Sequence, residues 1–336
     1  MLGVLAKLQD IGEKQVLKRL EKLLSMQWLC TSLSPGDDAV CAGKGHEDLL
    51  VKIDGGSVAS SLAPWMSYAD LGWQWVTATA SDLVAKAAKP LVFLVSVGLS
   101  PEEPEEHLYE IVEGAIEAAR GHGAWLGGGD TNGSYGAGWI DVAGIGKAVQ
   151  LPLPGRRARP GDQVYVTIGR LGLSGIVLHS LLHGNWAEAK KSFPEAFSEF
   201  TRPLARLGFL ELYRALGHEC VTASLDISDG LADTLYQLSE ATRRVIVLDN
   251  LPEISIVAEY ARLYGTSYSE LLLYGGQEYE LVFTVSPECK NNVETIARQI
   301  GLEITRIGHV TRIEDVAVKL GNRIVERRGW DNFARA

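Results

Sequence analysis

The chain has 336 residues, of which 46% are hydrophobic and 22% are charged. These fractions are typical of folded globular proteins and exclude a disordered or fibrous chain, and the length favours two domains over a single hydrophobic core. The formal net charge of −10 argues against non-specific binding to nucleic acid, which needs a basic surface. An acidic protein that binds phosphates needs something to neutralise them, and a divalent metal held by carboxylates is the usual solution.

Residues 1–24 mix charged with apolar side chains, which is typical of an amphipathic helix and not of a signal peptide. No apolar run reaches the roughly 18 residues that a membrane span needs, so we expect a cytoplasmic protein with no membrane contact. The cysteines form no CxxC pair, and four are too few for a disulfide scaffold of this length. We therefore expect reduced, structural thiols at Cys30, Cys41, Cys220 and Cys289.

The first half alternates between helix and strand. Apolar spacing predicts the elements, and Lys89-Pro90 is expected to end the long helix, because the residue before proline disfavours helical geometry. After the N-terminal helix, the expected elements are a loop over 34–38, a strand over 49–53, a helix over 68–88, a strand over 91–97, a helix over 104–122 and a glycine-rich loop over 127–129.

A segment rich in proline, glycine and arginine lies between residues 150 and 162. Such a composition is typical of a linker, so we place a domain boundary there, between residues 1–150 and 151–336. The second half is expected to contain a strand over 163–168, a glycine-rich turn over 169–175, a helix to about 182, an extended segment over 224–229, a helix over 230–242 and strands over 245–248 and 279–285. This succession of strands and helices indicates an α/β (α+β) protein.

The sequence contains neither a GxxxxGK[ST] phosphate loop nor a GxGxxG fingerprint. Aspartates recur instead where strands or helices meet glycine-rich loops. Each one alone has an ordinary explanation as a turn or helix-cap residue. They are Asp37, Asp38, Asp54, Asp82, Asp130, Asp226 and Asp229.

Two of these places point to metal binding. Asp82 falls inside an apolar predicted helix, where a lone buried carboxylate is costly unless a metal or a basic partner neutralises it. Asp226 and Ser228 share one face of an extended segment, and Asp229 opens the next predicted helix. Carboxylate and hydroxyl oxygens suit magnesium, which takes its remaining ligands from water and substrate phosphates. The sequence therefore predicts a kinase-like magnesium site without a phosphate loop.

The aspartates belong to longer motifs that span nearly the whole chain. These are PGDDAV at 35–40, SDLVAKAAKP at 81–90, GGGDTN at 127–132, RPGDQVYVT at 159–167, DISDGLADTL at 226–235, GGQEYELVFT at 275–284 and GWDNF at 329–333. In their content and order the chain resembles the thiamine-monophosphate kinases. That family belongs to a superfamily with aminoimidazole ribonucleotide synthetase, selenophosphate synthetase and a hydrogenase-maturation protein.

The resemblance implies a two-domain aminoimidazole ribonucleotide synthetase-like fold. Its N-terminal domain would bind ATP and Mg²⁺ and form a homodimer through its sheet, and its C-terminal domain would complete the nucleotide and acceptor site. The implied reaction is transfer of the γ-phosphoryl group of ATP to thiamine monophosphate by direct in-line attack, giving thiamine diphosphate. Both reactants are anions, so positioning and charge neutralisation would carry the catalysis.

The resemblance also implies roles for single residues. The magnesium ligands would be Asp38, Asp54, Asp82, Asp130, Asp226 and Asp229, of which the last two would also be the catalytic residues.

Other residues would contact the two substrates. Ser228 and the glycine-rich segment with Gly129 and Asp130 would lie against the nucleotide phosphates. Arg156 is the candidate for an arginine near ATP, with its neighbours at 157 and 159 as alternatives. Trp330 matches an aromatic residue that stacks on the thiamine ring, with a buried C-terminal anchor as the alternative.

The chain departs from the family pattern in two places. Lys52 and Ile53 precede Asp54 where the family has hydroxyl or small residues. Lys52 would either supply a fixed positive charge where a magnesium would otherwise lie or point to solvent. Ser61 stands near the place of a family histidine and Gln277 replaces a glutamate, both where the family contacts thiamine phosphate. Two alternatives follow: an ATP-dependent relative with a different acceptor, and a non-catalytic nucleotide-binding member.

Overall fold

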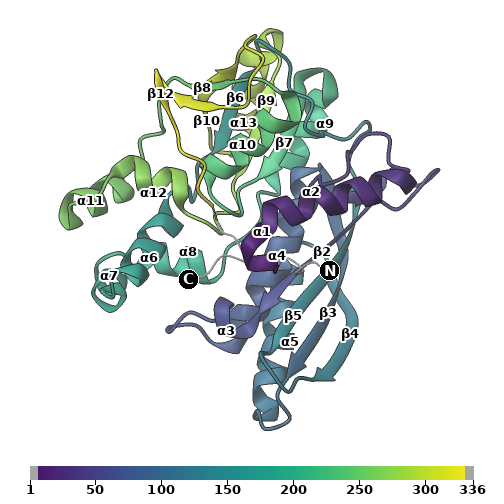
Figure 1. The fold of residues 1–336 in the computed structure, drawn as a ribbon, viewed down its shortest axis with the longest axis vertical. Coiled ribbons are helices and arrows are strands. Elements are labelled where there is room, and N and C mark those ends of the chain that lie inside the picture. The colour runs from purple at the N-terminus through teal and green to yellow at the C-terminus, as the bar shows by residue number, and fades with distance from the viewer. Residues whose placement is uncertain (1–6, 330–336) are drawn as a thin grey trace, which may run out of the picture.

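The computed structural model describes residues 7–329. Within them the strands form two sheets with helices packed against both (Figure 1). This mixed architecture confirms the α/β (α+β) class. In the same range, no helix is long and apolar enough to cross a membrane.

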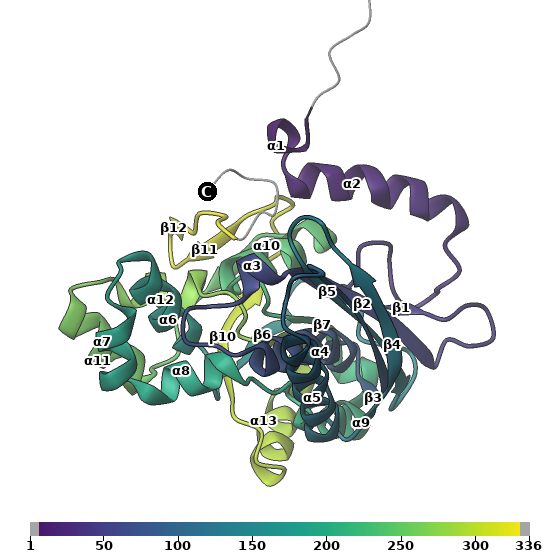
Figure 2. The ribbon, with the colours of Figure 1, turned by 90° about the horizontal axis from the view of Figure 1, so that it is seen from below.

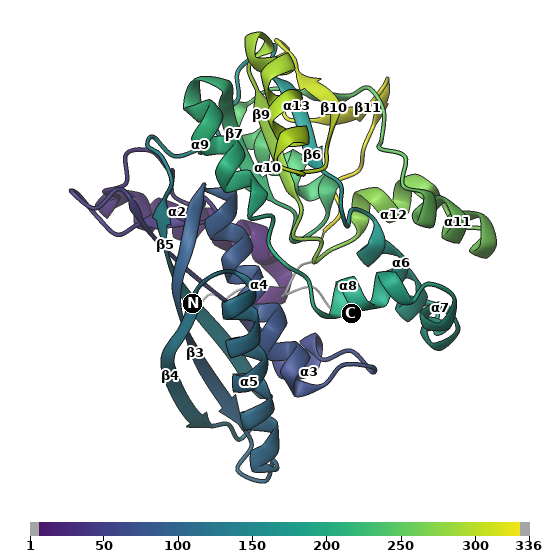
Figure 3. The same cartoon turned by 180° about the vertical axis from the view of Figure 1, so that it is seen from behind.

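The N-terminal half contributes the first sheet. Its strands are β1 (Val40–Cys41), β2 (Leu49–Ser57), β3 (Ala88–Leu99), β4 (Trp125–Gly133) and β5 (Trp139–Ala148). They lie in the order β1-β2-β5-β3-β4, antiparallel except for the parallel pair β3 and β4. Two long helices, α4 (Tyr68–Ala85) and α5 (Glu105–Gly121), cover one face of this sheet (Figure 3), and the short α3 (Val58–Ser61) follows β2.

Helix α4 is buried along most of its length, because it lies between the first sheet and the C-terminal half. A capping box begins it: the Ser67 hydroxyl accepts from the Asp70 amide, and the Asp70 carboxylate accepts from the Ser67 amide. Gly72 lets α4 approach α5 closely, since a Cβ there would lie 2.0 Å from the carbonyl oxygen of Ile111. This packing fixes the position of the C-terminal turn, which carries Asp82.

The C-terminal half contributes the second sheet. Its strands are β6 (Gln163–Thr167), β7 (Val221–Asp226), β8 (Ile246–Leu248), β9 (Leu281–Val285), β10 (Ile304–Val310), β11 (Val318–Leu320) and β12 (Arg323–Ile324). They lie in the order β12-β11-β8-β10-β6-β9-β7, with β11 and β8 parallel and the other described pairs antiparallel. The edge strand β7 contacts α4, which joins the two halves.

Most remaining helices belong to the C-terminal half. One group lies to the side of both sheets (Figure 1) and comprises α6 (Leu173–Leu182), α7 (Trp186–Ser192), α8 (Pro194–Thr201), α11 (Ser255–Tyr264) and α12 (Tyr268–Tyr274). Another group lies around the second sheet and comprises α9 (Gly208–Cys220), α10 (Leu231–Thr242), the short η2 (Pro287–Cys289) and α13 (Lys290–Gln299).

The predicted N-terminal helix is broken at Gly12, whose φ is 79°. The pieces are α1 (Leu8–Ile11), α2 (Glu13–Leu24) and the 3-10 helix η1 (Ser25–Gln27). Lys14 forms an ion pair with Asp233 on α10, and Lys18 Nζ lies 2.9 Å from Glu240 Oε1 on the same helix. Charged side chains therefore attach helix α2 to the C-terminal half. The helix itself lies at the outside of the molecule (Figure 2).

Two hydrophobic cores support the fold. The buried residues of one all lie within 158–325. The other is shared, with Leu50 and Phe93 from the first half packed in one cluster with Phe209 and Phe283 from the second. In the sequence, the strands of the first sheet precede the proline-rich segment and those of the second sheet follow it. In the structure, the shared core connects the two sheets. The division into domains 1–150 and 151–336 stays a prediction.

The predicted end of the long helix is wrong. The helix expected over 68–88 ends at Ala85, and β3 begins three residues later. Ala87 has a φ of 54°, which a helix does not accept. Pro90 lies inside β3, where the register with β5 shifts between Pro90 and Val92. The proline thus marks a bulge, at which its missing N–H is tolerated.

The glycine run over 127–129 is part of strand β4, not a loop. A Cβ on Gly129 would lie 1.7 Å from the carbonyl oxygen of Val95 on β3. No other residue fits this close approach of two strands, which is a structural reason for the glycine that composition alone does not reveal.

The cysteines are paired, which corrects the expectation of reduced thiols. Cys30 is bonded to Cys41 and Cys220 to Cys289, each pair with Cα atoms 5.5 Å apart, a typical distance for disulfides. The second pair joins residues 69 positions apart in the chain. Folding, and not spacing along the sequence, brings these side chains together, so the sequence pattern did not reveal them.

Candidate active site

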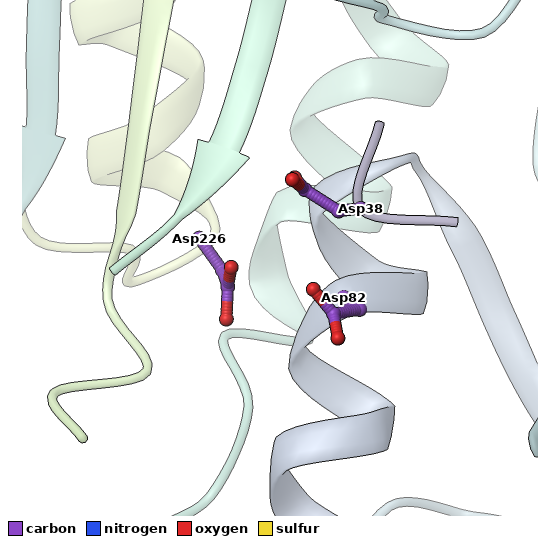
Figure 4. Close-up of side chains that lie close together, drawn as sticks. All are labelled: Asp38, Asp82 and Asp226. Carbon is purple, nitrogen blue, oxygen red and sulfur yellow. The ribbon is translucent and has the colours of Figure 1, made fainter. Parts of the chain in front are cut away.

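Three carboxylates from distant parts of the chain meet where the two halves join (Figure 4). Asp38 lies in the loop before β1, Asp82 in the last turn of α4 and Asp226 at the end of β7. Each offers an oxygen within 4.8 Å of those of the other two, and each residue is at most 9% exposed. These oxygens are close enough together to ligate one hard cation.

A buried lysine holds the loop that carries Asp38. Lys86, at the C-cap of α4, is fully buried and lies one helical turn after Asp82. Its Nζ lies 2.6 Å from Asp37 Oδ1 and 3.2 Å from Asp38 Oδ2, and it donates to the carbonyl oxygen of Ser224 on β7. One ammonium group thereby connects the loop, α4 and β7.

Arg156 approaches the same loop from the segment between the sheets. Its Nη2 donates to Asp38 Oδ1 at 2.6 Å, and its Nε lies 3.4 Å from Asp37 Oδ1. Burial alone would raise the pKa of Asp38, but the charges of Lys86 and Arg156 outweigh it and lower that pKa to about 2. Asp38 is therefore ionised at neutral pH.

Lys52 enters the group from β2, with its Nζ 2.7 Å from Asp82 Oδ2. Burial would lower the pKa of this ammonium, but Asp82 and Asp54 raise it, so Lys52 stays charged. Burial and repulsion from Asp38 raise the pKa of Asp226 to about 7, because another negative charge is unfavourable there. A cation bound between the carboxylates would remove this cost.

Two further aspartates flank the three. Asp54 on β2 accepts from the amide of Gly55 at 3.0 Å, and its charge acts on Lys52, Asp82 and Asp226. It therefore belongs to the same electrostatic group.

Asp229 lies in the loop between β7 and α10. The prediction that it opens the helix is wrong by two residues, because α10 begins at Leu231 and Gly230, with a φ of 102°, is the N-cap. Burial raises the pKa of Asp229 to about 6, with Asp233 adding to the effect. Asp229 thus also favours a nearby cation.

A cavity of about 790 Å³ opens beside these carboxylates. Asp37, Arg156 and Asp229 line it, and α2 and α10 contribute further walls. Its basic lining residues are Lys14, Lys18, Arg156, Arg157, Arg243 and Arg327. Acidic side chains of both helices lie among them, so charged groups of both signs line the cavity.

The segment that carries Gln277 lies against the loop after β7. The backbone N–H of Gln277 donates to the carbonyl oxygen of Ser228 at 2.6 Å, and the backbone N–H of Tyr279 donates to the carbonyl oxygen of Ile227 at 2.9 Å. Gln277 and Tyr279 have φ values of 60° and 50°, which are unfavourable for side-chain-bearing residues and are often retained at functional sites. The side-chain oxygen Oε1 of Gln277 is buried and has no hydrogen-bond partner within the described part of the chain.

Two of the remaining predicted site residues lie on the edge strand of the first sheet. Gly129 and Asp130 are exposed on the edge strand β4, where Asn132 Nδ2 donates to Asp130 Oδ2 at 3.0 Å. Among residues 7–329, the group close enough to share one cation does not include Asp130. Ser61 ends α3, and Trp330 falls outside the described residues. Their predicted roles stay predictions.

Lys86 and Tyr279 belong to the site but were not predicted from the sequence. A signal for Lys86 exists, because it is a charged residue four positions after Asp82 in an otherwise apolar stretch. Tyr279 is buried near the aspartates, and burial followed by the charge of Asp54 raises the pKa of its hydroxyl well above the ordinary value. Its left-handed backbone leaves no periodic signal in a sequence.

Comparisons with known proteins agree with this arrangement. Residues 36–148 match the family model described as AIR synthase related protein, N-terminal domain. The chain is 32% identical to the thiamine-monophosphate kinase of Pyrobaculum calidifontis over 264 residues, which cover 79% of this chain and 82% of the relative.

Solved structures share the whole fold. The structure of tt0281 from Thermus thermophilus has 34% identity and a TM-score of 0.86, and the match covers 96% of this chain and 100% of that one. AaThiL complexed with AMPPCP and TMP has 25% identity and a TM-score of 0.81, with 98% and 100% covered. Identity at this level over most of both sequences, together with the shared fold, shows that the chain belongs to the thiamine-monophosphate kinase family.

Proposed function

We propose that the protein transfers the γ-phosphoryl group of ATP to thiamine monophosphate, giving thiamine diphosphate. The observation that carries this proposal is the meeting of Asp38, Asp82 and Asp226. Their neighbours Asp37, Arg156 and Asp229 line a cavity of about 790 Å³, a volume typical of small-molecule sites. Family membership supports the reaction, and the complex of AaThiL with AMPPCP and TMP supports both ligands.

The residues of this site fit magnesium. Carboxylate oxygens are the hard ligands that Mg²⁺ prefers, and the raised pKa of Asp226, caused by burial and by Asp38, indicates that the group favours added positive charge. Asp38, Asp82 and Asp226 would hold an ion directly, with Asp54 and Asp229 at its flanks. When bound, magnesium neutralises phosphate charge and fixes the phosphate geometry.

On the nucleotide side, Arg156 and Ser228 are proposed to lie against the phosphates. Arg156 lines the cavity and is already held by Asp38 at 2.6 Å, so it needs little reorganisation to face an anion. Gly129 and Asp130 are proposed for the same role, and Asp130 also as a metal ligand, on the family motif.

On the acceptor side, Ser61, Gln277 and Trp330 are proposed to contact thiamine monophosphate. Gln277 supports this best, because its buried amide oxygen has no partner within residues 7–329 and can accept a hydrogen bond from a ligand.

The reaction needs no strong base, because a phosphate monoester is largely ionised at neutral pH. The chain therefore contributes position and charge. Asp226 and Asp229 are proposed as the catalytic carboxylates in this sense, and Lys86 holds the Asp38 loop rigid against α4 and β7.

The test is ADP formation by Asp226→Asn in the presence of magnesium and thiamine monophosphate. Outer-shell changes at metal sites cost about 10-fold to 100-fold, so loss of a direct ligand should cost at least about 100-fold. Asp48→Asn is the matched control, because the Asp48 side chain is 42% exposed and pairs only loosely with Lys147, at 3.7 Å. Full turnover by Asp226→Asn would contradict the assignment.

A second candidate is an ATP-dependent enzyme with a different acceptor. Gln277, with its unpaired amide oxygen in the described part of the chain, favours it, because an amide presents a donor as well as an acceptor to the ligand. ADP release measured against a set of phosphate and carboxamide acceptors separates the two. Binding of nucleotide without any turnover would instead indicate a non-catalytic member.

We also propose a homodimer through the first sheet. Ile53 of β2 and Leu94 of β3 are both paired with one residue of β5. Trp125 of β4 and Ile145 of β5 are both paired with one residue of β3, which lies two positions from Leu94. All four side chains therefore share the face opposite α4. They are 66%, 46%, 62% and 37% exposed in the order Ile53, Leu94, Trp125 and Ile145, and an apolar patch of this kind marks an interface.

The cytoplasmic location stays a prediction. Disulfides persist in oxidising compartments and in the intracellular proteins of hyperthermophiles, so the Cys30–Cys41 and Cys220–Cys289 bonds fit the cytoplasm only for an organism of the latter kind.

A further inference from the structure

Lys52 points from the first sheet into the carboxylate group. It lies opposite Gly144 of β5, and a Cβ on Gly144 would lie 2.7 Å from Cγ2 of Thr79 on α4. Residues paired across a sheet project to the same face, so Lys52 faces α4. Asp82 follows Thr79 by about one helical turn, and its Oδ2 lies 2.7 Å from the Lys52 ammonium.

The other fixed cations of the site are engaged elsewhere. Lys86 and Arg156 contact Asp37 and Asp38 at 2.6 to 3.4 Å. Within residues 7–329, the ion pair of Asp82 is with Lys52. Three fixed positive charges therefore face the carboxylates Asp37, Asp38, Asp54, Asp82 and Asp226, with Asp229 at the flank of the same group. The carboxylates outnumber the fixed positive charges, and a divalent cation offsets this excess of negative charge.

We propose that Lys52 takes the place of one metal ion in this site. Its ammonium occupies a cation position beside Asp82, holds that carboxylate in place without metal, and limits the protein alone to one bound divalent cation. This inference rests on the proposed metal site, and it makes Lys52 a positioning residue. An ammonium supplies one charge and three donors but no octahedral coordination, so the phosphates are left to the single metal.

The test is the number of divalent ions bound by the full-length chain without nucleotide. Mn²⁺ alone is the probe, titrated by calorimetry and by the electron paramagnetic resonance signal of the free ion. The wild type should bind one Mn²⁺. Lys52→Met should bind two, because it opens the cation position and adds one uncompensated negative charge. Lys52→Arg keeps the charge and should bind one.

Lys147→Met is the matched control. Lys147 lies on β5 of the same sheet, is exposed, and has only Asp48 as a distant ion-pair partner in the described part of the chain, at 3.7 Å, so its removal should leave the stoichiometry at one. Thermal unfolding gives a second readout: Lys52→Met should have a lower Tm than the wild type without metal, and Mn²⁺ should raise its Tm by more. Lys52→Thr serves the same test if the methionine variant does not fold.

The outcomes separate this inference from the proposed function. Binding of one Mn²⁺ by Lys52→Met with wild-type affinity and an equal Tm response overturns the role of Lys52 and leaves the metal site intact. Absence of Mn²⁺ binding by every variant overturns both the inference and the magnesium assignment.

Discussion

The ammonium nitrogen of Lys86 lies 2.6 Å from Oδ1 of Asp37, and both side chains are at most 1% exposed. The two residues come from the end of α4 and from the loop before β1, so the pair fixes the loop that presents Asp38. A buried ion pair adds little net stability when intact, but removal of one partner leaves an unpaired charge in the interior.

Lys86→Met should therefore destabilise the protein by about 3 to 5 kcal/mol, measured by urea unfolding. Lys89→Met is the control, because Lys89 is three residues away and exposed on β3. Equal stability of the two variants would show that the pair does not hold the loop.

The stability of the metal-free protein should fall as the pH rises. Burial raises the pKa of Asp226 to about 7, that of Asp229 to about 6 and that of Glu278 to about 8. The folded state binds these protons more tightly than the unfolded state, in which carboxyl pKa values are about 4. Their contribution is thus complete below about pH 4 and is lost as the pH rises towards 8.

Calorimetry should accordingly give a lower Tm at pH 8 than at pH 5 without metal, and Mg²⁺ should raise the Tm more at pH 8, where no proton must be displaced. Asp226→Asn should make the pH dependence smaller, because Asp229 and Glu278 still titrate. A Tm that rises between pH 5 and pH 8 without metal would contradict the raised pKa values.

The two disulfides should stabilise the chain to different degrees. The loops that they close span 11 and 69 residues, for which the chain-entropy model gives about 3 and about 4 kcal/mol. Urea unfolding of Cys30→Ser and Cys220→Ser measures these losses. Thiol titration of the denatured wild type, prepared without reductant, should detect no free thiol, and four titratable thiols would contradict both bonds.

The exposed face of the first sheet should control assembly. Leu94→Lys combined with Ile145→Lys places two charges in the apolar patch and should convert a dimer to a monomer, as measured by sedimentation equilibrium. Leu182→Lys is the control, because Leu182 is 85% exposed on α6, away from the first sheet. A wild type that sediments as a monomer would refute the dimer proposal.

The succession of strands and helices predicts the fold class. The family resemblance implies six aspartate ligands, of which the structure brings Asp38, Asp82 and Asp226 together. Asp82 is predictable on physical grounds: a carboxylate in an apolar helix needs a cation nearby, and the structure supplies Lys52 at 2.7 Å. This need can be predicted from one sequence, because the apolar neighbours of Asp82 in its own helix are visible there.

Other features depend on contacts between distant segments. The disulfide pairing, the left-handed backbone of Gln277 and the ion pairs of Lys86 are set by the packing of the two halves, to which no periodic pattern corresponds. The prediction of a loop at the glycine run is wrong for a related reason. Gly129 is required by the nearness of Val95 in the neighbouring strand, and a sequence does not display its cross-strand neighbours.

Helix α4 presents Asp82 to Lys52 on β2 and to Asp226 on β7 and, four residues later, Lys86 to the Asp37 loop. Each residue of an α-helix turns the chain by about 100°. Insertion or deletion of one residue between the capping box at Ser67 and Lys86 would therefore swing both charged groups away from their partners at once. The site therefore fixes the length of this helix as well as the two charged side chains that it carries.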